Sequence, residues 1–474
     1  MEAGKLRKDA IGLAGIVFMV IATNGPLTSL VGAVPTTIAV GNGAGVPAVF
    51  ICLGLLYVLF SVGFTAMSRH VKNAGAFYAY IANGLGRPTG VAAAFTAIVA
   101  YGALQIALFA MMGFFLSQAL SDFFHIHLEW WVSALITCSV VQYAGYKNIE
   151  VSGKILGFLM VAEVLVMLVF DTAVVAHGGG PEGLSLTSFA PSTFMTPGFG
   201  AAVVFIISCY TGFETTAIYA EEARDPGRTI PRATYTAVVI IMTLYALSSW
   251  AIVTAYGPSN IVALAQKDPG NLWSVMATKI AGNWLADSIS VLMITSLLAA
   301  LISFHNTISR YVFSLAREQL LWKQFARTHS TQQTPYIASM TQTAITVLLL
   351  VAFGVSGYDP LLVVMPITAL VSSIGIVSVQ ATTGLSVVAF FWRDHRGVSL
   401  WQRFVAPLLS AIGLFACLVL MLLNKDLLTG GIDTPLVRSL PWDMLAVAVS
   451  GFVVAVWCKY KKPMVYTNLG RTLN

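Results

Sequence analysis

Charged residues are scarce in this 474-residue chain. Only 10% of its residues are Asp, Glu, Lys or Arg, whereas 57% are hydrophobic; a soluble domain is typically about 25% charged. The composition therefore excludes an ordinary soluble globular protein. Apolar stretches close to the roughly 20 residues that a helix needs to cross a bilayer recur along the whole sequence. They predict an all-α integral membrane protein.

Cysteine clusters and nucleotide-binding patterns are also missing. The five cysteines lie in apolar stretches and show no CxxC spacing, which argues against a disulfide framework and against a metal site. No Walker sequence, Rossmann glycine pattern or zinc spacing occurs. We therefore predict no cofactor, no metal and no catalytic residue. An ATP-driven pump and a redox enzyme both lack support.

Glycine, proline and charge clusters divide the sequence into about twelve predicted spans. They are residues 11–40, 46–67, 89–119, 129–145, 152–175, 199–221, 233–256, 284–310, 335–355, 359–390, 403–423 and 441–459. The stretch 257–283 carries the turn signal Asp268-Pro269-Gly270. We expect a loop there with at most short surface helices.

The basic residues are distributed unevenly about these spans. If both termini are cytoplasmic, only four of the 26 Lys and Arg residues lie outside: Lys267, Lys279, Lys425 and Arg438. Cytoplasmic loops carry an excess of Lys and Arg. We therefore predict a multi-pass protein of the plasma (inner) membrane, monomeric or homodimeric, with residues 1–10 and 460–474 in the cytoplasm. This placement accounts for the net charge of +6 without a nucleic-acid partner.

Two polar interruptions cut otherwise apolar spans. The first is residues 23–26, Thr-Asn-Gly-Pro, and the second is residues 209–214, Cys-Tyr-Thr-Gly-Phe-Glu. Unwound backbone at membrane depth persists only where it is buried in protein or lines a polar cavity. Corresponding breaks in two halves are typical of the substrate and ion sites of secondary transporters. The alternative, for the proline-containing segment taken alone, is a mere kink.

The spans form two sets of five that can be laid over each other. Residues 11–175 hold spans one to five and residues 199–390 hold spans six to ten, and each set begins with an interrupted helix. Because five is odd, the second set enters the membrane from the opposite side, which predicts an inverted-topology repeat. The two spans in residues 403–459 have no counterpart. The predicted fold is a 5+5 inverted repeat plus two extra helices.

Two acidic residues lie inside apolar spans. Glu214 ends the second interruption, and Glu163 lies in the middle of the fifth span with no basic residue within a helical turn. A carboxylate in a bilayer is costly unless it is paired, protonated or facing water, so such residues are functional by default. We expect Glu214 to carry a proton. Three partners stay open for Glu163: a bound cation, a substrate amine and the freed carbonyls of the first helix. For both glutamates, the alternative is a purely structural role.

Further residues complete the predicted site. Tyr101 and Gln105 share a face of the third span, although such groups more often join neighbouring helices. Tyr210 or Phe213 would cover an amine by cation–π contact. The predicted substrate-binding residues are Thr23, Asn24, Gly25, Pro26, Tyr101, Gln105, Ser208, Cys209, Tyr210, Thr211, Gly212 and Phe213, with Glu214 and Glu163 for proton coupling.

Three segments are similar to segments of one known family. Residues 73–88, with NAGAFYAY and GLGRP, resemble the loop after the second span of the amino acid-polyamine-organocation transporters. Residues 212–232, with GFE, AEEARDP and IPR, resemble that family's sixth span and the loop behind it. Residues 309–318, with SRY and ARE, look like its loop after the eighth span. The segments occur in the family's order.

The resemblance implies a twelve-span, LeuT-like fold that moves amino acids or related amines, often with protons. In that family the first break usually carries a Gly-Ser-Gly-like stretch whose amides hold a substrate carboxylate. Here Asn24-Gly25-Pro26 stands at that place with one donor removed, so a substrate without a carboxylate, or one held differently, gains support. Glu163 stands where some sodium-independent members have lysine, which argues against a lysine-based coupling scheme.

The sequence thus predicts a secondary active transporter for amino acids or closely related amines, with proton-coupled uptake by alternating access. Two buried acids without a basic residue at that depth favour a substrate that carries an amino group. A polyamine or organic amine carrier, or an exchanger, is the alternative within transport. A transporter-like nutrient receptor is the alternative from another class, although the sequence shows no long cytoplasmic domain for signalling.

Overall fold

The computed structural model describes residues 12–71, 77–146, 153–214, 216, 223–329, 334–425 and 435–470. Within these residues the chain is built from helices, and an isolated bridge between Gly180 and Gly183 is its β feature. The long helices are α3 (Val46–Ser68), α5 (Arg87–Phe124), α6 (Trp130–Tyr146), α7 (Gly153–Ala176), α11 (Pro226–Tyr256), α14 (Asn283–Arg317), α15 (Tyr336–Val355), α16 (Met365–Arg393), α17 (Ala406–Leu423) and α19 (Pro435–Lys461).

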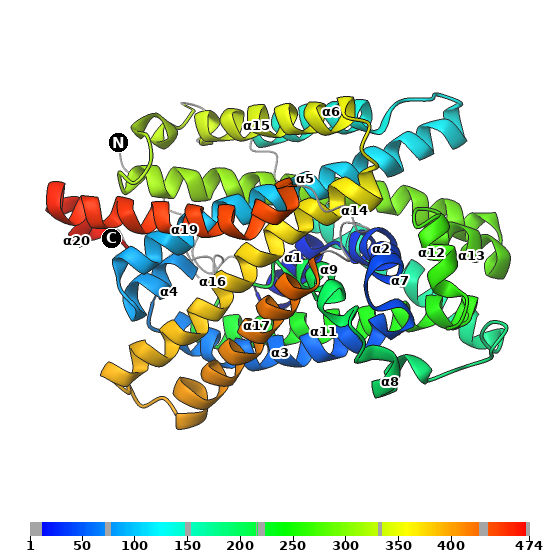
Figure 1. Ribbon diagram of the computed structural model, residues 1–474, viewed down its shortest axis with the longest axis horizontal. Coiled ribbons are helices and arrows are strands. Elements are labelled where there is room, and N and C mark those ends of the chain that lie inside the picture. Colours follow the sequence, from blue (N-terminus) through cyan, green and yellow to red (C-terminus); the bar gives the residue numbers. More distant parts are fainter. Residues whose placement is uncertain are drawn as a thin grey trace.

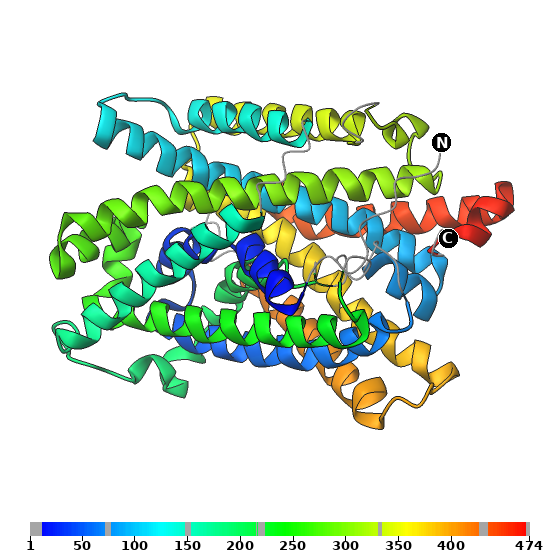
Figure 2. The same ribbon diagram turned by 180° about the vertical axis from the view of Figure 1, so that it is seen from behind.

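Most of these helices run along the longest axis of the molecule. α6 and α15 lie side by side along one flank, and α3 and α11 lie side by side along the opposite flank (Figures 1 and 2). The helices α1 (Leu13–Asn24) and α9 (Phe199–Tyr210) lie in the middle, between the two flanks (Figure 1). The centre of the bundle is therefore built by the two helices that the sequence interrupts.

The described residues contain nine stretches long and apolar enough to cross a membrane. They are Thr28–Ser68, Arg87–Phe124, Gly157–Ala176, Pro226–Tyr256, Asn283–Arg317, Tyr336–Val355, Pro360–Arg393, Trp401–Leu423 and Val437–Lys461. The first of these joins the second half of predicted span one to span two. The shorter helices α1, α6 and α9 account for the other predicted spans, so the total of about twelve spans stays a prediction, as does the inverted repeat.

The first predicted span is divided in the structure. α1 ends at Asn24, and Gly25 follows with a φ of +57°, a left-handed conformation that glycine adopts at little cost. The chain continues as the π-helix η1 (Thr28–Ala33), the short helix α2 (Val34–Thr37) and the π-helix η2 (Ile38–Asn42). A π-helical turn holds one more residue than an α-helical turn and often marks a functional site.

The sixth predicted span is divided as well. α9 ends at Tyr210, Thr211 is extended with a ψ of 128°, and Gly212 has a φ of +120°. Ala201 to Ile207 are completely buried, and a helix that is apolar and buried on all sides belongs to the interior. Residues 217–221, the end of this predicted span, lie outside the described residues.

Small residues set the distance between the helices that surround the centre. Gly375 on α16 packs against Ala100 on α5, and Gly384 on α16 packs against Ala411 on α17. Such residues let helix backbones approach closely, which is how membrane helices associate without a hydrophobic driving force. These close crossings form a scaffold around α1 and α9.

Short helices and loops close the two ends of the bundle. The predicted loop 257–283 holds the short helices α12 (Ile261–Lys267) and α13 (Leu272–Ala281), as expected. The helix α20 (Pro463–Asn468) lies at the opposite end (Figure 1). Residues 1–10 and 471–474 of the predicted cytoplasmic termini, and residues 73–76 and 220–222 of the loop motifs, lie outside the described residues.

Candidate functional site

The two helix breaks face each other. A Cβ atom placed on Gly212 would lie 3.2 Å from Cγ2 of Thr23 and 3.6 Å from the side-chain amide of Asn24. The break after α9 therefore packs directly against the end of α1. The backbone at residue 212 lies so close to α1 that only glycine fits there without displacing Thr23.

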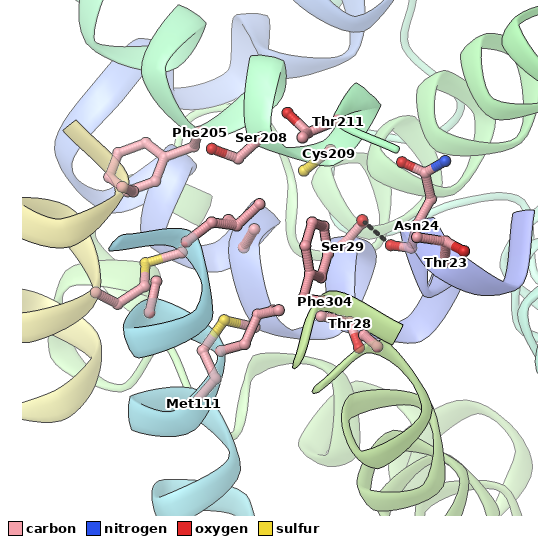
Figure 3. A pocket seen from close by; sticks show the side chains of 17 residues that line it. Thr23, Asn24, Thr28, Ser29, Met111, Phe205, Ser208, Cys209, Thr211 and Phe304 are labelled. Atoms are coloured by element: carbon pink, nitrogen blue, oxygen red, sulfur yellow. Dashed lines mark hydrogen bonds between the residues drawn. The ribbon is translucent and has the colours of Figure 1, made fainter. Parts of the chain in front are cut away.

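A small cavity lies beside the two breaks. Its volume is about 40 Å³, enough for a few water molecules and too small for an amino acid. Hydroxyl, thiol and amide groups come from the broken helices, and apolar side chains come from α5, α14 and α16 (Figure 3). The lining residues are Thr23, Asn24, Thr28, Ser29, Ala33, Leu104, Ala107, Leu108, Met111, Phe205, Ser208, Cys209, Thr211, Ala300, Phe304, Met365 and Ala369.

Five predicted site residues line this cavity. Thr23 and Asn24 come from the first break, and Ser208, Cys209 and Thr211 come from the second. Figure 3 shows the two groups approaching the cavity from different helices. These five predicted residues therefore share one cavity, and their contact with a substrate stays a prediction.

Asn24, a residue of the cavity lining, has an unused acceptor. Its amide nitrogen donates to the carbonyl oxygen of Val20 at 3.1 Å, whereas its Oδ1 is buried and has no hydrogen-bond partner among the described residues. An unsatisfied buried acceptor costs about 1–3 kcal/mol. A donor on a bound molecule would remove this cost.

Thr28 and Ser29 also line the cavity, although they were not predicted. The Oγ of Ser29 donates to the carbonyl oxygen of Asn24 at 3.1 Å, as the dashed line in Figure 3 shows. That carbonyl is one of the groups freed by the helix break. Both residues lie in the π-helical turn just after Pro26, and a search one turn beyond the proline would have found them.

Tyr101 and Gln105 are not among the residues that line the cavity, and their contact with the substrate stays a prediction. The hydroxyl of Tyr101 donates to Oε1 of Glu214 at 2.8 Å. Gln105 accepts a hydrogen bond from Gln342 on α15. Tyr101 therefore holds an acid, and Gln105 joins two helices, the packing role that such groups often have in membranes.

Tyr210 and Phe213 also point elsewhere. The hydroxyl of Tyr210 donates to the carbonyl oxygen of Phe50 at 2.7 Å, and its ring stacks on Tyr57 with the centroids 5.0 Å apart. The ring of Phe213 contacts Tyr57 and Phe60 at centroid distances of 5.2 and 6.0 Å. Aromatic packing against α3 uses these rings, so neither covers the cavity.

The backbone residues of the two breaks stand behind the cavity wall. Gly25, Pro26 and Gly212 are absent from the lining. A Cβ on Gly25 would lie 2.9 Å from Oγ1 of Thr28 and 3.1 Å from Oγ of Ser296. These residues shape the breaks and do not themselves face the cavity.

Glu163 binds the backbone just after the first break. Its Oε2 accepts the N–H of Leu27 at 3.4 Å and the hydroxyl of Ser296 at 2.8 Å. Ser296 in turn accepts the hydroxyl of Thr28 at 3.1 Å. Glu163 thus contacts the first break by accepting an amide N–H, not through the freed carbonyls that the sequence suggested; the cation and the substrate amine stay open.

Glu214 binds the second break in a similar way. Its Oε2 accepts the N–H of Gly212 at 2.8 Å, and its Oε1 accepts the hydroxyl of Tyr101. Only 2% of its surface is exposed. Each break is thus held by one buried glutamate.

The chain matches one protein family over nearly its whole length. The amino acid permease family model matches residues 11–453. An uncharacterized transporter of Mycobacterium tuberculosis is 26% identical over 292 residues, which are 61% of this chain and 59% of that relative. The match therefore spans about three fifths of that relative's length.

Two further relatives come from Bacillus subtilis. The serine/threonine exchanger SteT is 23% identical over 356 residues, which cover 74% of this chain and 78% of SteT. The branched-chain amino acid permease BcaP is 23% identical over 210 residues, which cover 44% of this chain and 42% of BcaP. With the family match and its apolar helices, this multi-pass membrane protein belongs to the amino acid permease family, as the resemblance of its loops predicted.

Proposed function

We propose that this protein is a secondary transporter that carries an amino acid or a closely related amine by alternating access around the cavity between α1 and α9. The observation that carries the proposal is the pair of facing helix breaks, together with the cavity beside them and the unpartnered Oδ1 of Asn24, a residue that lines it. Freed backbone groups and buried polar side chains at membrane depth are typical of transport sites.

The amino group of the substrate is the part that this site fits best. Neither an acidic nor a basic side chain is among the described residues that line the cavity. Oδ1 of Asn24 can accept a hydrogen bond, and so can the oxygens of the hydroxyl groups around it. An ammonium group has only donors, so it would satisfy these acceptors.

The carboxylate of an amino acid has fewer partners at the first break. Pro26 has no N–H, and the N–H of Leu27 points to Glu163. This arrangement favours a second candidate, an amine without a carboxylate. The names of SteT and BcaP refer to amino acids, which favours the first candidate. An experiment is therefore needed to separate the two candidates.

The two glutamates are the proposed coupling groups. Each accepts an amide at a break, from Leu27 in one case and from Gly212 in the other. A neutral acid binds an amide less strongly than a carboxylate does. Proton loading at Glu163 or Glu214 would therefore loosen a break, which links protonation to movement of the broken helices.

Counterflow in proteoliposomes tests the proposal. Vesicles loaded with unlabelled serine or leucine should accumulate the same labelled amino acid transiently. Ethanolamine and isopentylamine, their decarboxylated counterparts, should compete if the amine candidate is right. The Asn24→Ala variant should lose apparent affinity, because Oδ1 is the proposed amine acceptor, whereas Asn83→Ala, outside the cavity, is the control.

Two results would count against the proposal. The first is an absence of counterflow with every tested amino acid and amine, in protein whose cooperative thermal unfolding shows that it is folded. It would exclude transport of these compounds. Binding without counterflow would instead support the receptor alternative.

A further inference from the structure

A second cavity lies next to the central one, towards the end of the molecule where α13 lies. It has a volume of about 240 Å³, and we call it the vestibule. Its wall comes from the ends of α5 and α14, from the residues before α13 and from η1, and the exposed side chains of Asp122 and Asp287 stand in that wall. The vestibule therefore reaches the surface, whereas the residues that line the central cavity are almost all buried.

The two cavities are lined by neighbouring residues of η1. Val31 lines the vestibule and Ala33 lines the central cavity, so Gly32 lies between residues that face the two spaces. Met111 of α5 lines the central cavity, and Met293 of α14 lines the vestibule. Both methionines are buried, with 3% and 0% of their surface exposed.

The two methionines meet over Gly32. A Cβ on Gly32 would lie 1.9 Å from the methyl carbon of Met111 and 2.9 Å from the methyl carbon of Met293. The missing side chain of Gly32 is thus the space that both thioethers fill. Removal of either methyl group would leave a gap between the vestibule and the central cavity.

We propose that Met111 and Met293, packed on Gly32, form the gate through which the substrate of the proposed transport function passes from the vestibule to the central cavity. Methionine suits this role because its unbranched chain has three rotatable bonds and reshapes easily. The gate is purely apolar, so it shuts out water without hydrogen bonds that would have to break on opening.

The native thiol of Cys209 reports on this gate. Cys209 lines the central cavity and is 4% exposed, so a charged methanethiosulfonate reagent reaches it only after the cavity opens. The test uses protein in nanodiscs in which Cys52, Cys138, Cys417 and Cys458 are replaced by alanine. The rate of Cys209 modification is followed by mass spectrometry.

The Met293→Ala variant should raise that rate by about tenfold. Truncation of the methionine removes packing that stabilises the closed form, so the open form becomes more populated. Met111→Ala should act in the same direction. Since both side chains close one gap, the double variant should gain less than the product of the two single effects. Met112→Ala is the matched control, because Met112 is buried on the same helix as Met111 and lines neither cavity.

The route itself is tested by filling the vestibule. Ser290 lines the vestibule, so Met293→Ala combined with Ser290→Trp should return the rate to that of the parent protein. An unchanged rate in Met293→Ala, an equal gain in Met112→Ala, or a gain that survives Ser290→Trp would each overturn the gate. The measurement needs no transported substrate, so a negative counterflow result with a positive labelling result would refute the proposed function and leave the gate standing.

Discussion

The two helix breaks solve the same problem with partners of different origin. At the second break, Glu214 accepts the N–H of Gly212, only two residues away in the sequence. At the first break, the N–H of Leu27 is accepted by Glu163 from α7, 136 residues further along the chain. The glutamate at the second break belongs to the break itself, whereas the glutamate at the first break belongs to a neighbouring helix.

This difference has a mechanical consequence. The bond between Gly212 and Glu214 moves with the end of α9, whereas the bond between Leu27 and Glu163 holds only while η1, α7 and α14 keep their places. We expect the first break to be the one whose hydrogen bonds change when the transporter opens. The following substitutions test that expectation.

Gly212→Ala should have the largest effect. Gly212 has a φ of +120°, and its added Cβ would press on Thr23; such strain costs about 3 kcal/mol. Gly25→Ala at a φ of +57° should cost less backbone energy, about 1–2 kcal/mol, although its Cβ would lie 2.9 Å from Oγ1 of Thr28. Counterflow should disappear in the first variant and decline in the second. Equal losses of thermal stability would contradict the distinction between the two breaks.

Glu214→Gln should have the next largest effect. Without a titratable group at the second break, uptake driven by an imposed pH gradient should become independent of pH, while counterflow continues. Glu163→Gln should instead lower the apparent affinity, because it changes the group that holds Leu27 beside the cavity. Unchanged proton-driven uptake in Glu214→Gln would exclude that residue from the coupling scheme.

Ser296→Ala and Tyr101→Phe should have the smallest effects, since each removes one hydroxyl donor to a glutamate. A hydrogen bond contributes about 0.5–1.5 kcal/mol, and more when a charged group accepts it. Ser296 also accepts from Thr28, so its loss should lower the thermal midpoint more than the loss of the Tyr101 hydroxyl. A larger shift for Tyr101→Phe would show that the second break contributes more to stability.

Much of the centre could be predicted because breaks leave a local signal. Glycine, proline and polar residues inside an apolar span are visible in the sequence, and they placed Thr23, Asn24, Ser208, Cys209 and Thr211 at the cavity. The long apolar spans were equally visible. The helix α11 also extends beyond the predicted span 233–256: it begins at Pro226, and its polar first turns lack a hydrophobic signal.

Other parts of the site have no such signal. The cavity lining includes Met111, Phe205 and Phe304. On a membrane helix, the same apolar residue types face lipid, a neighbouring helix or a cavity, so residue type alone does not identify them. Nor does the sequence reveal that the polar groups of Tyr101 and Gln105 bond to Glu214 and Gln342.

The sequence by itself determined that this chain lives in a bilayer, where its apolar spans lie and where two of them break, because hydropathy and backbone propensity are local properties. Only the tertiary structure decided which groups satisfy the breaks. The N–H of Leu27 needed an acceptor, and with no water in a bilayer core the acceptor had to come from protein. That acceptor is Glu163, which folding brings from a distant helix.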